Sequence, residues 1–80
     1  MKRIGRDRFV RNVLIAVGNS GNETFIPVAE KLLNDHSPVV RAMAVWALAQ
    51  LMPNGDFQYL RTRQEKTESD LAVKAEWSSS

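Results

Sequence analysis

The stretch from Pro38 to Met52 limits what this chain can fold into more than any other segment. As a helix it is apolar almost all round, because only Arg41 and Gln50 interrupt it with strongly polar side chains. Such a helix must be covered on more than one side, so other elements of the 80-residue chain have to pack around it. Ser37 can cap its start and Pro38 suits the first helical position, which places the helix at residues 38–52.

A first helix is predicted over residues 6–18, where apolar side chains recur with the spacing of one helix face: Val10, Val13, Leu14 and Val17. It should stop within residues 18–22, because the glycines and asparagines there tolerate the left-handed conformation that closes a helix.

A second helix is predicted over residues 24–34, with an apolar face made of Phe25, Val28, Ala29 and Leu32. Thr24 is its predicted cap, since that start puts Pro27 in the first turn, where a missing N–H costs no hydrogen bond.

A weaker pair of helices is expected after Pro53, over residues 56–67 with Asp56 as cap and over residues 70–77. Because each of these segments has helical spacing or helix-start signals, the chain is predicted to be all-α.

An internal repeat decides between the possible architectures. Val40-Arg41-Ala42-Met43 returns as Val73-Lys74-Ala75-Glu76, 33 residues later, and Val10-Arg11 lies 30 residues before Val40-Arg41. Shorter, more polar helices lie between these segments, which is the alternation of outer and inner helices in an α-solenoid, an α-α superhelix. An isolated three-helix bundle is the alternative. About two helix pairs plus a leading helix fall short of the usual three repeats, so we expect a fragment of a longer protein.

Composition excludes several kinds of site. With no cysteine, the chain cannot hold disulfides, thiolate metal sites or iron–sulfur clusters, and one histidine, His36, makes a metal site improbable. No apolar run approaches the roughly 18 residues of a membrane span, and no signal peptide follows the start, so we expect a cytoplasmic protein.

The opening segment, residues 2–19, contains Arg11-Asn12 before an apolar helix that ends in Gly18-Asn19. In this it resembles the C-terminal HEAT-like repeat region of epoxyqueuosine reductases. The segments Asp35 to Arg41, Val45 to Leu48 and Val73 to Trp77 are similar to the repeat helices of that region.

The resemblance implies that the parent protein is a cytoplasmic oxidoreductase of queuosine tRNA modification, with two 4Fe-4S clusters and cobalamin. It implies that this chain is a non-catalytic tail, with tRNA and the upstream catalytic domain of the same polypeptide as partners. No residue here matches the cluster-binding cysteines or the catalytic acid of the family. A general HEAT-type scaffold for protein interactions is the alternative function.

Positive charge gathers at the start of the chain. Residues 1–11 hold one acidic side chain, Asp7, and five basic ones, whereas the remaining residues hold six basic and eight acidic ones. Arginine pairs with phosphate and stacks on exposed bases, so the tentative RNA-binding residues are Lys2, Arg3, Arg6, Arg8 and Arg11. Arg8 and Arg11 share a helix face and form the core of this stripe. The alternative is that these basic residues are solvated charges, or that they pair with carboxylates of the catalytic domain upstream.

Arg41 and Lys74 follow a valine at the start of inner helices. We expect them to bridge to an acidic residue of a neighbouring repeat, for example Asp35 or Asp70, with an RNA contact as the alternative. Asp35 and Asp70 themselves are expected to be turn and cap residues.

The aromatic and histidine residues are given structural roles. Trp46 is predicted to lie in the core, and Trp77 either in the core or at an interface. His36 is expected to be a loop residue, and Tyr59 is given no special role.

Overall fold

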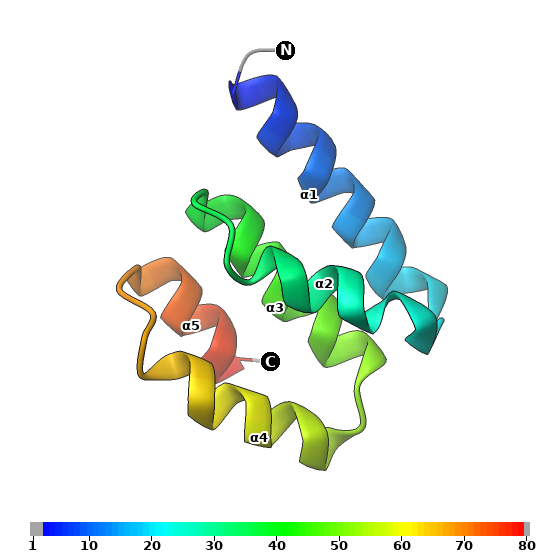
Figure 1. Ribbon diagram of the computed structural model, residues 1–80, viewed down its shortest axis with the longest axis vertical. Helices are drawn as coiled ribbons and strands as arrows, with labels where there is room; N and C mark the ends of the chain where they lie inside the picture. The colour runs from blue at the N-terminus through cyan, green and yellow to red at the C-terminus, as the bar shows by residue number, and fades with distance from the viewer. Residues whose placement is uncertain (1–2, 80) are drawn as a thin grey trace.

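The computed structural model describes the backbone of residues 3–79 and the side chains of residues 5–79, and this part of the chain contains helices and turns but no strand. The elements follow one another along the chain as shown in Figure 1: α1 (Arg3–Ser20), a 3-10 turn (Glu23–Phe25), α2 (Ile26–Leu32), α3 (Pro38–Leu51), α4 (Asn54–Glu65) and α5 (Leu71–Ser79).

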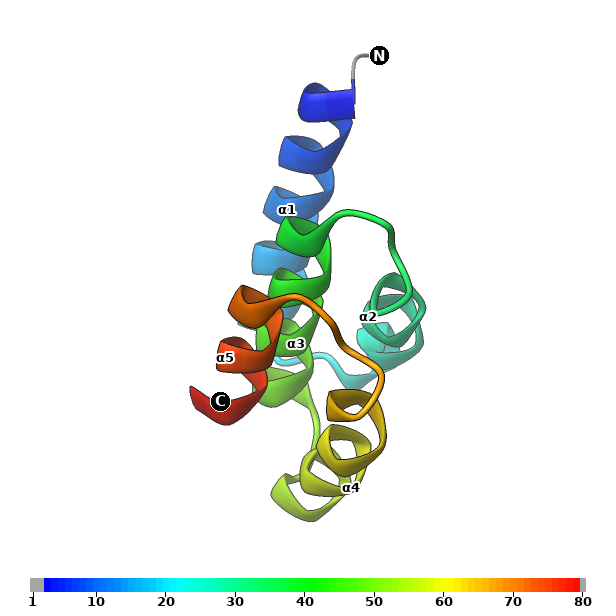
Figure 2. The same ribbon diagram turned by 90° about the vertical axis from the view of Figure 1, so that its left-hand side faces the viewer.

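The helices form two layers. Helices α1, α3 and α5 lie side by side and run in the same direction, and we call them the inner layer; α2 and α4 return on one side of it as the outer layer (Figures 1 and 2). Helix α3 packs against each of the four other helices. The prediction of an all-α superhelix is therefore confirmed, and the three-helix bundle is not formed, because α3 has more than two neighbours.

The core is centred on α3, as its apolar surface requires. Val40, Ala44 and Leu48 are fully buried, and α5 adds Val73 and Trp77. The ring of Trp77 lies against Phe57 of α4, with 5.4 Å between ring centroids. Trp77 is thus a core residue. The remaining buried apolar side chains come from α1 to α4 and from the residue that follows α2: Leu14, Val17, Ala29, Leu33, Val45, Ala47, Leu51 and Leu60.

The first helix does not end at Gly18. It continues to Ser20, and the left-handed residue is Gly21, with φ of 65°. Gly18 is buried inside the helix because the ring of Trp46 packs directly on it, where any Cβ would overlap the ring. Trp46 is only half-buried, so the prediction that it belongs to the core is correct for one face of its ring.

Two predicted caps are wrong. Helix α2 is preceded by a 3-10 turn, and Asn22, not Thr24, accepts the capping hydrogen bond, from the N–H of Thr24 to Asn22 Oδ1 at 3.0 Å. Helix α4 begins at Asn54, two residues before Asp56, which lies in its first turn and complements the positive helix end. Asn22 thus takes the capping role from Thr24, whereas the position before α4 is Pro53, which offers no side-chain cap.

Helix α2 also turns a different face inward than predicted. Ala29 is buried as expected, but Phe25 and Val28 are 38% and 45% exposed, and Leu33 takes a buried position instead. Val13 of α1 is likewise 38% exposed. Several apolar stripes compete on these helices, and only packing against α3 selects one.

Candidate nucleic-acid interface on the inner layer

The five basic residues predicted to bind RNA do not form one cluster. Lys2 lies outside the described residues, and only the backbone of Arg3 is described. Arg8 and Arg11 are exposed on α1 and form no ion pair or side-chain hydrogen bond within residues 5–79. Arg6 has a different environment, described below.

Arg8 and Arg11 line a groove of about 370 Å³ where α1 meets α3, together with Asp7 and Val39. Val39 is 52% exposed, so the groove has an apolar wall next to two guanidinium groups. The Asp7 carboxylate, which also lines the groove, accepts a hydrogen bond from Arg6 Nη1 at 3.0 Å, and this pairing offsets part of its negative charge. Guanidinium groups beside an apolar wall suit a phosphate and its attached sugar or base.

Arg6 is bound to Asp35, in the turn before α3. Its two terminal nitrogens donate to the two carboxylate oxygens at 3.0 and 2.6 Å, a bidentate pair. Hydrogen bonds from Arg6 lower the pKa of Asp35 to about 2, although burial of the carboxyl opposes this. The same bonds to Asp35 and Asp7 raise the pKa of Arg6. A phosphate would have to compete with Asp35 for Arg6, so this arginine fastens α1 to α3.

Arg41 forms the same arrangement one repeat later. Its Nε and Nη2 donate to the two carboxylate oxygens of Glu68 at 3.0 and 3.1 Å, and Nη1 donates to the carbonyl oxygen of Asp35 at 2.8 Å. The predicted bridge between repeats is therefore present, but its carboxylate belongs to Glu68 rather than to Asp35 or Asp70. Both partners are mostly buried, with side chains 17% and 10% exposed.

The two arginine pairs share one local design, which we call the repeat clasp. In each turn the acidic side chain also accepts the N–H two residues later, from Ser37 to Asp35 at 3.0 Å and from Asp70 to Glu68 at 2.9 Å. Asp35 and Glu68 are 33 residues apart, the spacing of the predicted repeat. That spacing was the signal that could have identified Glu68 from the sequence.

The sequence matches the HEAT-repeat family over residues 7–78. The chain belongs to the HEAT-repeat family. It is also 37% identical over 51 residues to an epoxyqueuosine reductase of Xanthomonas campestris pv. campestris. That match covers 62% of this chain and 14% of the length of the enzyme, so the chain spans only a small part of this relative. The resemblance noted in the sequence is thereby confirmed. The comparison with solved structures gave no significant match.

In HEAT terms, α2 and α3 form one helix pair and α4 and α5 form the next. Asp70 caps α5, because its Oδ1 accepts from the N–H groups of Ala72 and Val73 at 2.8 and 3.2 Å. Its predicted role is confirmed. Lys74, which corresponds to Arg41, forms no ion pair within residues 5–79.

The residues of this HEAT module do not fit the metal cofactors that the resemblance implies. Iron–sulfur clusters need thiolate ligands, and the chain has no cysteine. The described residues contain no group of three His, Asp or Glu side chains that could hold a metal ion. His36 lies exposed in the turn before α3, as expected of a loop residue. Within residues 3–79, no helix has both the length and the apolar character needed to cross a membrane.

Proposed function

We propose that this chain is a non-catalytic HEAT-type module of an epoxyqueuosine reductase and that it helps to bind and orient tRNA. The similarity to the Xanthomonas enzyme supports the assignment to that protein. The observation that carries the RNA-binding role is the pair of exposed, unbridged arginines, Arg8 and Arg11, beside the groove on the inner layer.

The repeat clasps give these arginines a rigid base. Arg6 lies two residues before Arg8 on the same helix, and its bidentate bond to Asp35 fixes that end of α1 on the turn before α3. The backbone that carries Arg8 and Arg11 is therefore fixed relative to Val39, while their guanidinium groups remain available to phosphate. A fixed backbone reduces what has to be ordered on binding to the two arginine side chains themselves.

The oxidoreductase chemistry of the proposed parent lies outside these residues. Its two 4Fe-4S clusters and cobalamin would be held by other parts of the polypeptide, in the cytoplasm. Helix α1 offers a surface for that catalytic part. Phe9 and Val13 lie one turn apart and are 62% and 38% exposed, on a different face from Arg8 and Arg11. We infer that the catalytic domain covers this apolar face.

The proposal is tested by the affinity of the chain for a tRNA anticodon stem-loop, measured by fluorescence anisotropy over a range of salt concentrations. Arg8→Gln and Arg11→Gln should each weaken binding and lower the salt dependence by about one phosphate contact. Arg61→Gln is the matched control, because it removes the same charge from α4, where Arg61 is paired with Glu65 at 3.9 Å.

Equal losses for all three variants would mean that only net charge matters and would contradict the proposal. An unrelated acidic protein serves as a second probe. If it binds more tightly than the stem-loop, the chain is a scaffold for protein interactions instead.

A further inference from the structure

The exposed face of α4 carries an aromatic and basic stripe that the proposed function does not use. Tyr59, Thr62, Arg63 and Lys66 follow the spacing i, i+3, i+4 and i+7, so they share one side of the helix. All four are exposed, and Tyr59 is 68% exposed. The stripe contributes nothing to the core, which α4 reaches through Phe57 and Leu60.

Within this stripe the guanidinium carbon of Arg63 lies 5.8 Å from the centre of the Tyr59 ring. This cation–π contact places a planar cation over one face of an exposed aromatic ring. Both groups stack readily on nucleobases, and every base offers a suitable face.

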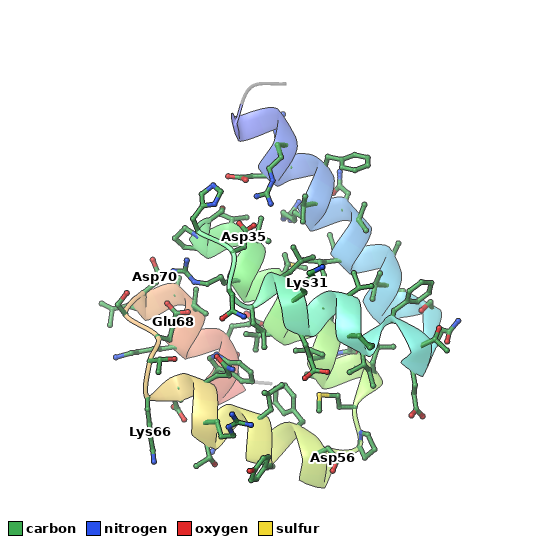
Figure 3. The ribbon with its side chains drawn as sticks, in the orientation of Figure 1. Lys31, Asp35, Asp56, Lys66, Glu68 and Asp70 are labelled. Carbon is green, nitrogen blue, oxygen red and sulfur yellow. The ribbon has the colours of Figure 1, made fainter. Side chains whose placement is uncertain are left out.

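The positive charge of the stripe is not neutralised within the described residues. Neither Arg63 nor Lys66 forms an ion pair there, and the carboxylate of Glu65 faces Arg61. Asp56, the other acidic residue of α4, lies at the opposite end of the helix from Lys66 (Figure 3). Arg63 at the ring and Lys66 about one turn further along the same side place aromatic and cationic groups in succession, which suits the alternation of base and phosphate in a nucleic-acid strand.

Arg63 also borders a groove of about 590 Å³ between α2 and α4. Pro27, Leu33 and Leu60 give this groove apolar walls. Its polar lining residues besides Arg63 offer hydrogen-bond donors and acceptors: Glu30, Lys31, Asn34 and Gln64. The groove is open to solvent, and its apolar walls with a few polar groups can receive the edge of a base at the surface.

We propose that α4 and this groove form a second site that binds unpaired nucleotides of a single-stranded nucleic acid. One base stacks on Tyr59 beside Arg63, the flanking phosphates pair with Arg63 and Lys66, and the adjacent base enters the groove. The site belongs to the outer layer, whereas Arg8 and Arg11 belong to the inner layer (Figure 2). It therefore does not rest on the proposed function.

The test uses the full 80-residue chain and a fluorescein-labelled ten-nucleotide oligouridylate, with oligothymidylate as a second probe, at low and moderate salt. Tyr59→Ala and Arg63→Gln should each raise Kd at least about fivefold, the usual scale for one lost base stack. Tyr59→Phe should keep most of the affinity, because it keeps the ring. Circular dichroism of each variant checks that these exposed substitutions leave the fold intact.

Arg61→Gln is the matched control, with an expected change in Kd below about twofold because Arg61 lies on a different side of α4 from Tyr59 and Arg63 and points towards Glu65. Equal effects of Arg61→Gln and Arg63→Gln, an unchanged Kd for Tyr59→Ala, or no binding at low salt would each overturn the proposal. Arg8→Gln separates the two sites. If it alone weakens oligonucleotide binding, the α4 site fails and the α1 site stands; if only the α4 variants weaken it, the reverse holds.

Discussion

Arg41 of α3 holds both carboxylate oxygens of Glu68, 27 residues later in the chain, at 3.0 and 3.1 Å. Arg6 of α1 holds Asp35 in the same way, 29 residues later. Each arginine lies on an inner helix, and its side chain binds a carboxylate in the turn before the next inner helix. The clasp therefore sets the position of one repeat on the previous one, in addition to the apolar contacts between the helices.

Glu68→Gln should lower the free energy of unfolding by about 1–3 kcal/mol, because it leaves the mostly buried Arg41 without its charged partner. Urea denaturation measures the loss. Glu65→Gln is the matched control, since Glu65 is 41% exposed and its bridge to Arg61 is long; its cost should stay below about 0.5 kcal/mol. Similar losses of unfolding free energy for both variants would show that the clasp stabilises the fold no more than a surface ion pair does.

Acid should weaken the fold through Asp35. Because its pKa is about 2 in the folded chain and near 3.9 when unfolded, the unfolded state binds this proton first as the pH falls. The stabilisation is present above about pH 4 and is lost as the pH falls towards 2. Thermal unfolding of Asp35→Asn should therefore depend less on pH across this window than that of the native chain. Parallel pH profiles for the two proteins would contradict this.

Gly18→Ala should destabilise the chain by about 1–3 kcal/mol, because the added Cβ overlaps the ring of Trp46. Helix propensity alone predicts the opposite, a gain of about 1 kcal/mol. Gly55→Ala, at a helical position with open space around it, should be neutral or slightly stabilising. Differential scanning calorimetry of the two variants decides the sign.

Leu48→Ala should cost about 2–5 kcal/mol, because Leu48 is completely buried in the last turn of α3 and its loss leaves a cavity. Val39→Ala, on the exposed side of the same helix, should change stability by no more than about 0.5 kcal/mol. Chemical denaturation of both variants is the measurement. A comparable loss at Val39 would mean that the inner face is covered in solution.

Asp70→Ala should destabilise α5 by about 0.5–2 kcal/mol, since Oδ1 of Asp70 accepts two N–H groups at the helix start. Ser37 occupies the corresponding position before α3, but its side chain makes no capping hydrogen bond. Ser37→Ala should therefore cost less than Asp70→Ala. Thermal unfolding followed by circular dichroism ranks the two, and the opposite order would be evidence against this account of the caps.

Some features followed from local sequence. The apolar circumference of residues 38–52 required neighbours on several sides, and Pro38 marked the start of α3 where the structure has it. Helix ends were harder to predict, because several polar residues near α2 and α4 are suitable caps. Asn22 caps in place of Thr24, and α4 begins at Asn54, directly after Pro53, with no side-chain capping hydrogen bond.

The candidate site was less predictable. Charge counting grouped Arg6 with Arg8 and Arg11, although Arg6 turns to Asp35 and only the other two remain available at the groove. That difference depends on a contact across 29 residues, which no local pattern contains. The sequence did not indicate Tyr59 and Arg63 as binding residues, because each alone is an ordinary surface residue. Their proposed role depends on the cation–π contact between them.

The sequence by itself determined the class of fold, since helical periodicity, turn residues and a 33-residue repeat are properties of neighbouring or regularly spaced side chains. Tertiary structure alone decided which apolar stripe of α2 faces inward, why Gly18 must be small, and which arginines are clasped or free. These outcomes depend on the packing of the inner helices against one another. An apolar side chain on α2 or an arginine on α1 fits several local arrangements equally well. Whether it is buried, ion-paired or exposed is decided only by the packing of the helices around it.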